Sequence, residues 1–596
     1  MAIQQKPEKN FFFGIGFLRS LTTLFPILYP RWEYAVLFTA LTGAAAGGFE
    51  KVNYDTGMMI GKFYTTLSMK DEPGFWHVFW KATAWYAAQC ALSALISFFS
   101  SALYLAFRNN LTKYLHQRYF SNNVCYQLNS VDNEGLDNPD QRMSQDVEKF
   151  CNLLAVRVFP NFLVAPFVVG YYTWRTWHTS GGVGVGVIYG YFLIGSFVNA
   201  FIIQPMTKWA GKVEKAEGCF RYKHVSVRDN AEGSAFYRAD LFELSECDRL
   251  FKNLLKKQAY FVGFKAPVMF WQNFFSYFGG VLTYAIQVIP IFWMHSYDDY
   301  DPMEFAGQLS NNAFVFMYLI NSFTKLTDLA SSVGEMAVYS QRIADLVSFT
   351  KEASVKANCF ENATAGGKPK SSYSLVVDKL TYGPPHSNDI LIRGLSVGVQ
   401  ERSSLLITGP SGIGKTSLFR VLAKLWNKNS GIVELPTGRG HLMFLPQRPY
   451  LPSGGTSLRQ QLLFPSQAPR NMATVVGDAK LESVLSSVGL SHLISMAGGL
   501  DEEADFEWAE RLTPGEAQRL SICRVLLTQP ALVFLDEATN SVPVDMEKTI
   551  YGLLKEAKIS YISTGHQATL RSYHDMELQI HGTDQHSLLA IENSQM

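Results

Sequence analysis

The sequence predicts a multidomain membrane protein: an all-α transmembrane domain of six helices, followed by an α/β domain with a phosphate-binding loop. Three observations support this prediction. The first half contains long uncharged apolar runs, a polar segment follows, and the second half contains a Gly-rich motif with Lys and Thr. At 596 residues the chain is too long for one domain. We expect a transmembrane domain at 1–345, a linker at 346–372 and a nucleotide-binding domain at 373–596.

The composition indicates contact with lipid rather than with nucleic acid. Lys and Arg number 52 and Asp and Glu 51, so the chain is nearly neutral and no nucleic-acid partner is expected. Charged residues make up 17% and aromatic residues 14%, which is little charge and much aromatic surface for a soluble protein. The seven cysteines contain no CxxC pair, so we expect reduced thiols rather than a disulfide framework or a zinc site.

Six apolar runs predict six membrane spans. A span needs about 20 residues, and the clear runs are Ala82–Phe107, Gly181–Met206 and Ala266–Met294. We assign three weaker runs to helices whose ends extend into water: Tyr34–Phe49, Val158–Trp174 and Leu309–Thr324. A buried core helix can mimic one weak run, but three strong runs in one chain exclude a fully soluble protein.

The flanking charges predict the orientation. The run Phe11–Pro30 looks like a signal peptide, but Arg19 and Pro26 interrupt it and no small-residue cleavage site follows, so we expect an interfacial helix. Lys and Arg are concentrated before the first span and in the loops after the second and fourth spans, whereas the loop after the fifth is acidic. Both termini and the two long loops are therefore expected in the cytosol.

Two stretches of these cytosolic loops, Asn138–Arg142 and Asn230–Arg238, have the pattern of a short helix at a loop tip. From pattern alone, an ordinary helix cap and a solvated face explain them better than contact with the second half. Arg157 and Lys265 lie where the third and fifth spans meet the cytosol. Snorkelling to lipid headgroups explains them more simply than a substrate path.

The phosphate-binding loop defines the second half. Residues 409–416 fit G-x-x-x-x-G-K-[ST], after a strand-like run at Ser404–Thr408 and before a helical pattern at Ser417–Trp426. Backbone N–H groups of such a loop surround phosphates, Lys415 neutralises their charge, and the Thr416 hydroxyl is a ligand for Mg²⁺. The predicted binding residues are Gly409, Pro410, Ser411, Gly412, Ile413, Gly414, Lys415, Thr416 and Ser417.

A second motif supplies two carboxylates. The apolar run Leu532–Leu535 predicts a buried strand that ends in Asp536 and Glu537. Asp536 is placed to hold Mg²⁺ through water, and Glu537 to polarise the attacking water as general base. A strand that ends in acids is common by itself, but together with the phosphate-binding loop it predicts nucleotide hydrolysis.

The segment Leu512–Arg519, LTPGEAQR, resembles the LSGGQ-type signature of ATP-binding cassette (ABC) transporters. Gln447 resembles the Q-loop of that family, His566 its switch histidine and Tyr382 its adenine-stacking aromatic residue. Taken one at a time, Gln447 and Tyr382 are typical of turn or core positions. His566 taken alone is typical of a histidine at the end of a strand that is hydrogen-bonded within the chain. The order of all six elements favours the family.

The resemblance implies a role for each of these residues. The implied catalytic residues are Glu537, His566 and Gln447. The implied Mg²⁺ ligands are Thr416, Gln447 and Asp536. The implied ATP-contacting residues outside the loop are Tyr382, Thr513, Gly515 and Glu516, the last three acting on the ATP of an opposite domain.

One cassette and six spans imply an exporter-type half-transporter that pairs with a second chain, a copy or a sister. In this family the ATP γ-phosphate lies between the loop of one domain and the signature helix of the other. The segments at Asn138 and Asn230, and Pro514 in the signature, are similar to subfamily D of peroxisomes and lysosomes, and most similar to its lysosomal cobalamin (vitamin B12) branch. This similarity implies a lysosomal membrane protein, with the endoplasmic reticulum as an alternative, and leaves open an escort membrane protein.

The chain departs from the family pattern at three positions. Pro514 removes an N–H from the signature, and Ala517 replaces a Gln or Lys. Pro543 stands where the family has Asp, with Asp545 two residues further on. Because the loop lysine, the two carboxylates and the switch histidine are intact, we expect a working but slow ATPase.

Two alternatives stay open. A peroxisomal importer of fatty acyl-CoA needs several Arg or Lys in its cavity to meet the phosphates, and the uncharged cores of the spans supply few. An ATP-dependent membrane scaffold or chaperone would hydrolyse ATP without moving a solute. The membrane in which the protein is found distinguishes the first alternative from a lysosomal transporter. Solute transport in reconstituted vesicles distinguishes the second alternative from a transporter of any kind.

Overall fold

The computed structural model describes residues 15–30, 34–131, 136, 138–298, 300–363, 373–385, 387, 389–436, 441–466 and 476–591. The chain divides into two compact units. The first contains Met1–Tyr119 and Glu134–Lys351, and the second contains Phe120–Asn133 and Glu352–Met596. A short segment from the first quarter of the chain is therefore part of the C-terminal unit.

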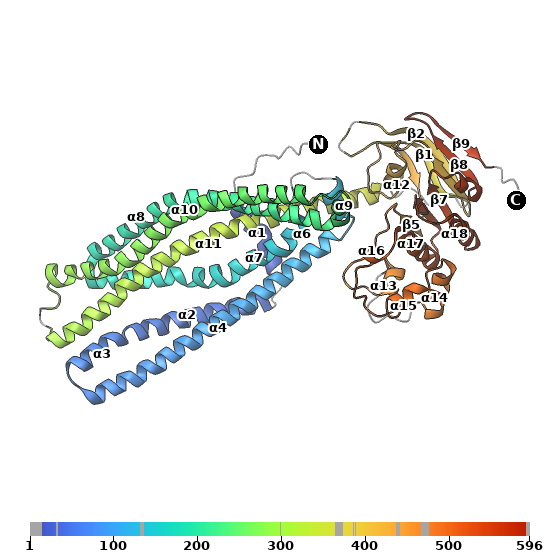
Figure 1. The fold of residues 1–596 in the computed structure, drawn as a ribbon. Coiled ribbons are helices and arrows are strands. Elements are labelled where there is room, and N and C mark those ends of the chain that lie inside the picture. The colour runs from blue at the N-terminus through green and yellow to red at the C-terminus, as the bar shows by residue number, and fades with distance from the viewer. Residues whose placement is uncertain are drawn as a thin grey trace. The chain divides into compact units, whose positions relative to one another are not determined.

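The first unit is a bundle of long helices (Figure 1). Its elements are α1 (Ile15–Leu28), α2 (Tyr34–Gly57), α3 (Met59–Ser68), α4 (Glu72–Tyr119), α6 (Pro139–Gln141), η2 (Arg142–Asp146), α7 (Val147–Asn152), η3 (Leu153–Val158), α8 (Phe159–Asp229), α9 (Ala231–Phe236), α10 (Asp240–Ile286), η4 (Ile289–Trp293) and most of α11 (Pro302–Ala363). Helix α11 continues into the segment expected as a linker, of which residues 364–372 lie outside the described part.

All six predicted spans lie on helices. Within the described residues, three continuous helical stretches are long and apolar enough to cross a membrane: Glu72–Tyr119, Pro139–Asp229 and Asp240–Trp293. The second contains two of the predicted spans, because α8 is broken at Gly181, where φ is 63° and ψ −167°. Glycine adopts this conformation without the steric cost that a Cβ would impose. The other two predicted spans lie on α2 and α11, which are not among these three stretches.

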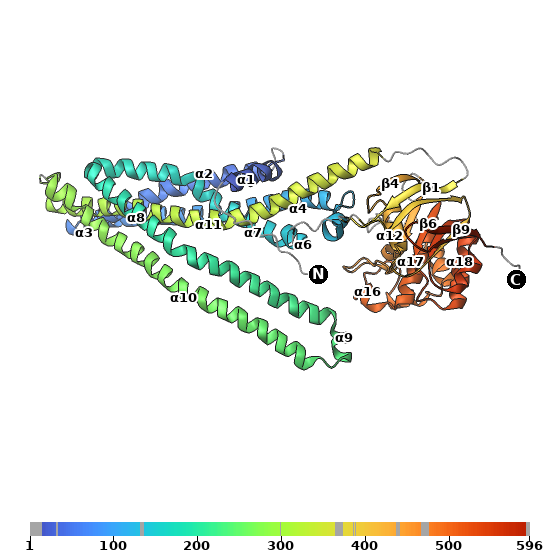
Figure 2. The same ribbon diagram turned by 90° about the horizontal axis from the view of Figure 1, so that it is seen from above.

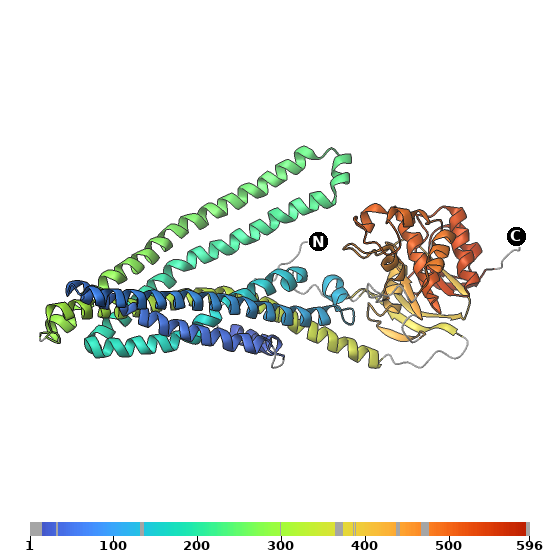
Figure 3. The ribbon, with the colours of Figure 1, turned by 90° about the horizontal axis from the view of Figure 1, so that it is seen from below.

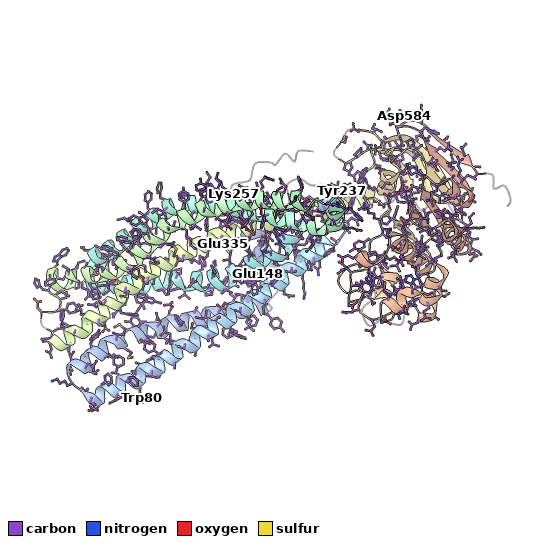
Figure 4. All side chains as sticks on the ribbon, viewed as in Figure 1. Trp80, Glu148, Tyr237, Lys257, Glu335 and Asp584 are labelled. Carbon is purple, nitrogen blue, oxygen red and sulfur yellow. The ribbon has the colours of Figure 1, made fainter. Side chains whose placement is uncertain are left out.

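Helices α8 and α10 pack along each other and are joined by the short helix α9. Figures 2 and 3 show this pair leaving the rest of the bundle towards α9. Helix α9 lies within the predicted stretch Asn230–Arg238, and none of its residues is buried. Tyr237, which follows α9, is 89% exposed (Figure 4). The predicted short helix at this loop tip is confirmed.

The stretch Asn138–Arg142 begins with Asn138 as the N-cap of a short helix, as its pattern predicts, although no side-chain cap hydrogen bond forms. It forms α6 and the start of η2 within the first unit. The buried guanidinium of Arg142 donates a hydrogen bond to the carbonyl oxygen of Arg342 in α11, at 2.9 Å. Asp146 forms an ion pair with Arg342 at 2.8 Å. This stretch is therefore tied to the helical bundle.

The second unit contains two sheets flanked by helices. Its elements are α5 (Val124–Tyr126), η1 (Gln127–Val131), β1 (Tyr373–Tyr382), β2 (Ile392–Gln400), β3 (Ser404–Thr408), α12 (Lys415–Leu422), β4 (Ser430–Glu434), β5 (Leu442–Leu445), α13 (Leu458–Leu463), α14 (Asp478–Ser487), α15 (His492–Met496), α16 (Trp508–Arg511), α17 (Pro514–Thr528), β6 (Leu532–Asp536), α18 (Val544–Glu556), β7 (Ser560–Thr564), η5 (Ala568–Tyr573), β8 (Met576–Ile580) and β9 (His586–Ala590).

Strand order places the predicted motifs at one edge. The larger sheet has the order β5-β6-β7-β3-β8-β9, and its strands are parallel except β9. The segments that follow β5, β6, β7 and β3 carry Gln447, Glu537, His566 and the phosphate-binding loop. Because these strands are parallel, all four segments emerge at the same edge, where α/β sheets bind ligands.

The segment Phe120–Val131 packs within the second unit. Val124 and Leu128 are buried. The indole Nε1 of Trp426 donates a hydrogen bond to the hydroxyl oxygen of Tyr126 at 3.1 Å, across 300 residues of sequence. The part of the loop between the second and third predicted spans that joins the C-terminal unit is therefore α5 with η1, and the sequence patterns did not identify it.

Buried His574 makes the stability of this unit depend on pH. Burial lowers the pKa of His574 to about 4, from 6.5, although a hydrogen bond with the Leu570 carbonyl opposes the change. Its Nδ1 lies 2.7 Å from that carbonyl oxygen and its Nε2 2.9 Å from Ser563 Oγ. Between about pH 4 and pH 6.5, His574 is therefore protonated in the unfolded chain but neutral in the folded unit.

We expect the unfolding free energy to fall by about 1.4 kcal/mol per pH unit as the pH drops from about 6.5 towards about 4. Thermal unfolding of the purified full-length protein across this range measures the slope. His574→Gln is expected to flatten it, whereas His581→Gln, at an exposed position, should keep it. An unchanged slope in His574→Gln would contradict this assignment.

Candidate ATP site

The phosphate-binding loop lies between β3 and α12, with Gly414 as the N-cap of the helix. Lys415 begins α12, and its side chain folds back over the loop: Nζ donates to the carbonyl oxygens of Gly409 at 2.8 Å and Pro410 at 3.1 Å. The residue is only 7% exposed. Burial lowers the pKa of Lys415, while Glu537 and Asp536 act to raise it. Two carboxylates thus favour the ammonium form at the helix N-terminus, where an anion binds.

Asp536 lies beside Thr416, as the sequence predicts for a metal site. The Thr416 hydroxyl donates to Asp536 Oδ1 at 3.2 Å, and the Thr564 hydroxyl donates to the same oxygen at 2.8 Å. Hydroxyl and carboxylate oxygens are suitable Mg²⁺ ligands, and Mg²⁺ in phosphate sites usually keeps several waters and needs few protein ligands. The residues present therefore fit this ion.

Glu537 is held by two amides. Its Oε2 accepts from Gln447 Nε2 at 2.9 Å and from Asn540 Nδ2 at 2.7 Å. Its Oε1 lies 3.8 Å from Nε2 of His566, and that nitrogen lies 3.3 Å from Lys415 Nζ. The backbone of Glu537 has a positive φ of 48°, a strained conformation that is common at functional sites. All three predicted catalytic residues are therefore brought together.

Gln447 contacts Glu537 rather than Asp536, so its nearest partner is the predicted base and not the predicted metal ligand. Asn540 and Thr564 complete the cluster, and the sequence reading did not include them. Asn540 follows Glu537 by three residues, and Thr564 precedes His566 by two. Both lie inside segments that the motifs already mark, and this proximity was the available signal.

Tyr382 differs from its predicted role. Its side chain is 0% exposed and belongs to the core between the two sheets. The hydroxyl donates to the carbonyl oxygen of Gly414 at 3.3 Å. A ring buried in this way supports the loop and presents no face to a nucleotide base. The stacking on adenine predicted from the sequence is not supported by this position.

The signature residues form a helix start. Thr513 is the N-cap of α17, and its hydroxyl and backbone N–H donate to Glu516 Oε2 at 2.7 and 2.9 Å. Pro514 occupies the first helical position, which suits proline because no intrahelical bond is needed there. Burial acts to raise the pKa of Glu516, but hydrogen bonds from Thr513 and His492 lower it overall. Glu516 Oε1 lies 2.8 Å from His492 Nε2.

These signature residues make no hydrogen bond with the phosphate-binding loop of the same chain, although the structure describes both segments. Thr513 and Glu516 bond each other and His492. The Gln518 Oε1 atom accepts from the Ser541 N–H at 3.0 Å, which joins α17 to the segment after Glu537. Within one chain the predicted site therefore consists of two separate parts.

Gly515 is required where α17 meets residues 537–541. A Cβ at this position would lie 2.6 Å from the backbone carbonyl oxygen of Ser541, so the loop must move. Because misplacement by about 1 Å can cost about 10²-fold in rate, we expect Gly515→Ala to lower ATP hydrolysis at least about tenfold. The ATPase rate of the purified variant measures this effect. Gly552→Ala, on α18 with open space around it, is the matched control and should retain activity.

Two family models match the chain: "ABC transporter transmembrane region 2" over residues 25–292 and "ABC transporter" over residues 392–540. The chain is 34% identical to the lysosomal cobalamin transporter ABCD4 of Homo sapiens, over 97% of both chains. It is 28% identical to ATP-binding cassette sub-family D member 3 of Mus musculus, over 80% of this chain and 75% of the relative.

The fold is similar to that of a solved structure, a bacterial Atm1-family ABC exporter with ATP bound. The TM-score is 0.68 at 16% identity, and the alignment covers 92% of this chain and 95% of the exporter. The exporter-type arrangement predicted from the sequence is therefore confirmed.

Proposed function

Because the chain belongs to subfamily D of the ATP-binding cassette transporters, a family of half-transporters that hydrolyse ATP as dimers, we propose that two copies of it move cobalamin from the lysosome to the cytosol. The supporting observation is the identity of 34%, over 97% of both chains, with a protein named as a lysosomal cobalamin transporter. We further propose a lysosomal membrane location and delivery by an escort membrane protein.

The proposed hydrolysis divides its tasks among the residues of the ATP site. Lys415 meets the β- and γ-phosphates, and Glu537 orients and deprotonates the attacking water while Gln447 and Asn540 hold its carboxylate. His566, beside both Glu537 and Lys415, completes the contacts around the γ-phosphate. Thr416 and Asp536 would hold Mg²⁺, which would supply positive charge to offset that of the phosphates.

Dimerisation completes the site. Thr513, Gly515 and the N-terminus of α17 in one copy would face the ATP bound by the loop of the other, where N–H groups and the helix dipole favour a phosphate. ATP binding then holds the two domains together, and hydrolysis releases them.

Vesicles loaded with labelled cobalamin test this function. ATP is added outside the vesicles, so only protein molecules whose nucleotide-binding domain faces outward can hydrolyse it. We expect these molecules to release cobalamin from the vesicles. Vesicles with the Glu537→Gln variant are the control. Equal release from both would remove the transport proposal and favour a scaffold, whereas transport of acyl-CoA but not of cobalamin would favour the peroxisomal alternative.

A further inference from the structure

The helical unit contains a cavity of about 200 Å³ that the predicted site does not include. Its walls come from α2, α4, α8 and α11. On α11, positions 318, 322, 325, 326 and 329 line it, which is the spacing of one helix face. Apolar residues form most of the wall, and the polar lining residues include Glu50, Ser93, Asn161, Tyr318, Ser322 and Lys325.

Glu50 supplies a carboxylate on α2. Its Oε2 accepts a hydrogen bond from the Tyr318 hydroxyl at 2.5 Å. An ionised carboxylate has acceptor capacity for about four hydrogen bonds, so one donor leaves most of it available. A carboxylate beside a mostly apolar wall is costly to desolvate unless it is paired or hydrogen-bonded.

Tyr318 lines the cavity, and a second tyrosine packs against its ring. The rings of Tyr172 and Tyr318 lie 4.5 Å apart between centroids. Tyr172 is 2% exposed, and its hydroxyl has no hydrogen-bond partner among the described residues. Tyr172 does not line the cavity, so its ring supports Tyr318 from behind while Tyr318 forms part of the cavity wall.

Lys325 supplies the opposite charge on α11. Its Nζ lies 5.5 Å from the centroid of the Tyr318 ring. Among the described residues, no carboxylate lies within ion-pair distance of this ammonium group. The cavity therefore offers an acceptor and a donor of opposite charge, with a net charge of zero from these two groups.

We propose that this cavity is a substrate subsite for a neutral carboxamide group. The Glu50 carboxylate accepts from the amide N–H groups, and the Lys325 ammonium donates to the amide oxygen. This inference rests on the proposed function, since cobalamin carries peripheral carboxamides. Pockets for drug-sized ligands occupy about 300–1,000 Å³, so this smaller space takes one part of a large solute. Coenzyme A carries several negative phosphate charges, so a site for it would instead need an excess of Lys or Arg side chains.

ATPase stimulation of the full-length protein in lipid nanodiscs tests the subsite with cyanocobalamin and with a derivative whose amides are hydrolysed to carboxylates. In the wild type we expect cyanocobalamin to act at a concentration at least about tenfold lower, because the carboxylates meet Glu50. Glu50→Gln should reduce this preference to about threefold or less, since the like charge is removed. Lys325→Ala should raise the half-maximal concentration of cyanocobalamin at least about tenfold.

Glu304→Ala and Lys62→Ala remove exposed charges of the same helical unit that do not line the cavity, and both should behave as wild type. Nucleotide binding by every variant checks that the protein is folded. If the wild type responds to cyanocobalamin and Glu50→Gln keeps the full preference, the subsite is wrong and the transported solute is unaffected. If the wild type responds to neither compound, the cobalamin proposal fails and the carboxamide assignment fails with it.

Discussion

Replacing Glu537 with Gln is expected to lower the rate of ATP hydrolysis by about 10²- to 10⁴-fold, the usual contribution of a general base. Glutamine has nearly the same shape, so ATP still binds and the two domains still associate. The carboxylate oxygen that takes the proton is lost. Steady-state phosphate release measures the rate, and equilibrium binding of labelled ATP shows that the site is intact.

Glu556→Gln is a matched control, because Glu556 is an exposed carboxylate on α18 of the same unit. It should hydrolyse ATP at the wild-type rate. If Glu537→Gln retained more than about a tenth of the wild-type activity, another residue would have to act as the base. The variant should also accumulate as an ATP-bound dimer, which size-exclusion chromatography with light scattering detects.

Replacing Lys415 with Met is expected to weaken ATP binding by about 10- to 100-fold and to lower the maximal rate by about 10²- to 10³-fold. A hydrogen bond to a charged group is worth about 1.5–3 kcal/mol, which sets the loss in affinity. Stabilisation of the charge that develops in the transition state sets the loss in rate. ATP titrations of binding and of hydrolysis separate the two effects.

Lys480→Met, at an exposed position on α14, should leave both quantities unchanged. Lys415→Arg keeps the charge but not the compact ammonium group, so it should recover little activity. If Lys415→Met hydrolysed ATP at the normal rate, the phosphate-binding loop would not be part of the ATP site. If a protein held as a monomer hydrolysed ATP at the normal rate, the proposal that two chains share the ATP site would be wrong.

The ATP site could be predicted from the sequence because its chemistry lies in short contiguous motifs. Lys415, the two carboxylates at the end of β6 and His566 after β7 are placed by strands that the apolar pattern marks. Parallel strands bring their ends to one edge of the sheet. Tyr382 was misassigned because a strand-end aromatic residue has the same pattern whether it faces solvent or the core. Only the packing of the β1 sheet against the larger sheet and α12 distinguishes these cases.

The cavity of the helical unit could not be predicted for a related reason. The predicted spans Tyr34–Phe49 and Leu309–Thr324 stop immediately before Glu50 and Lys325, because a charged residue ends an apolar run. In the structure, α2 continues to Gly57 and α11 to Ala363, so both charges lie within helices. A search for uncharged apolar runs therefore ends before both residues, although the helices that carry them continue.

The bond between Tyr126 and Trp426 also has a consequence for biosynthesis. The two residues are 300 positions apart, and the ribosome adds about 5–20 residues per second. The loop that carries Tyr126 therefore waits about 15–60 s for its partner surface to emerge. During that interval Val124 and Leu128, which are buried in the finished protein, lack the surface that covers them and are available to chaperones. Translation speed is thus expected to influence the yield of the assembled chain.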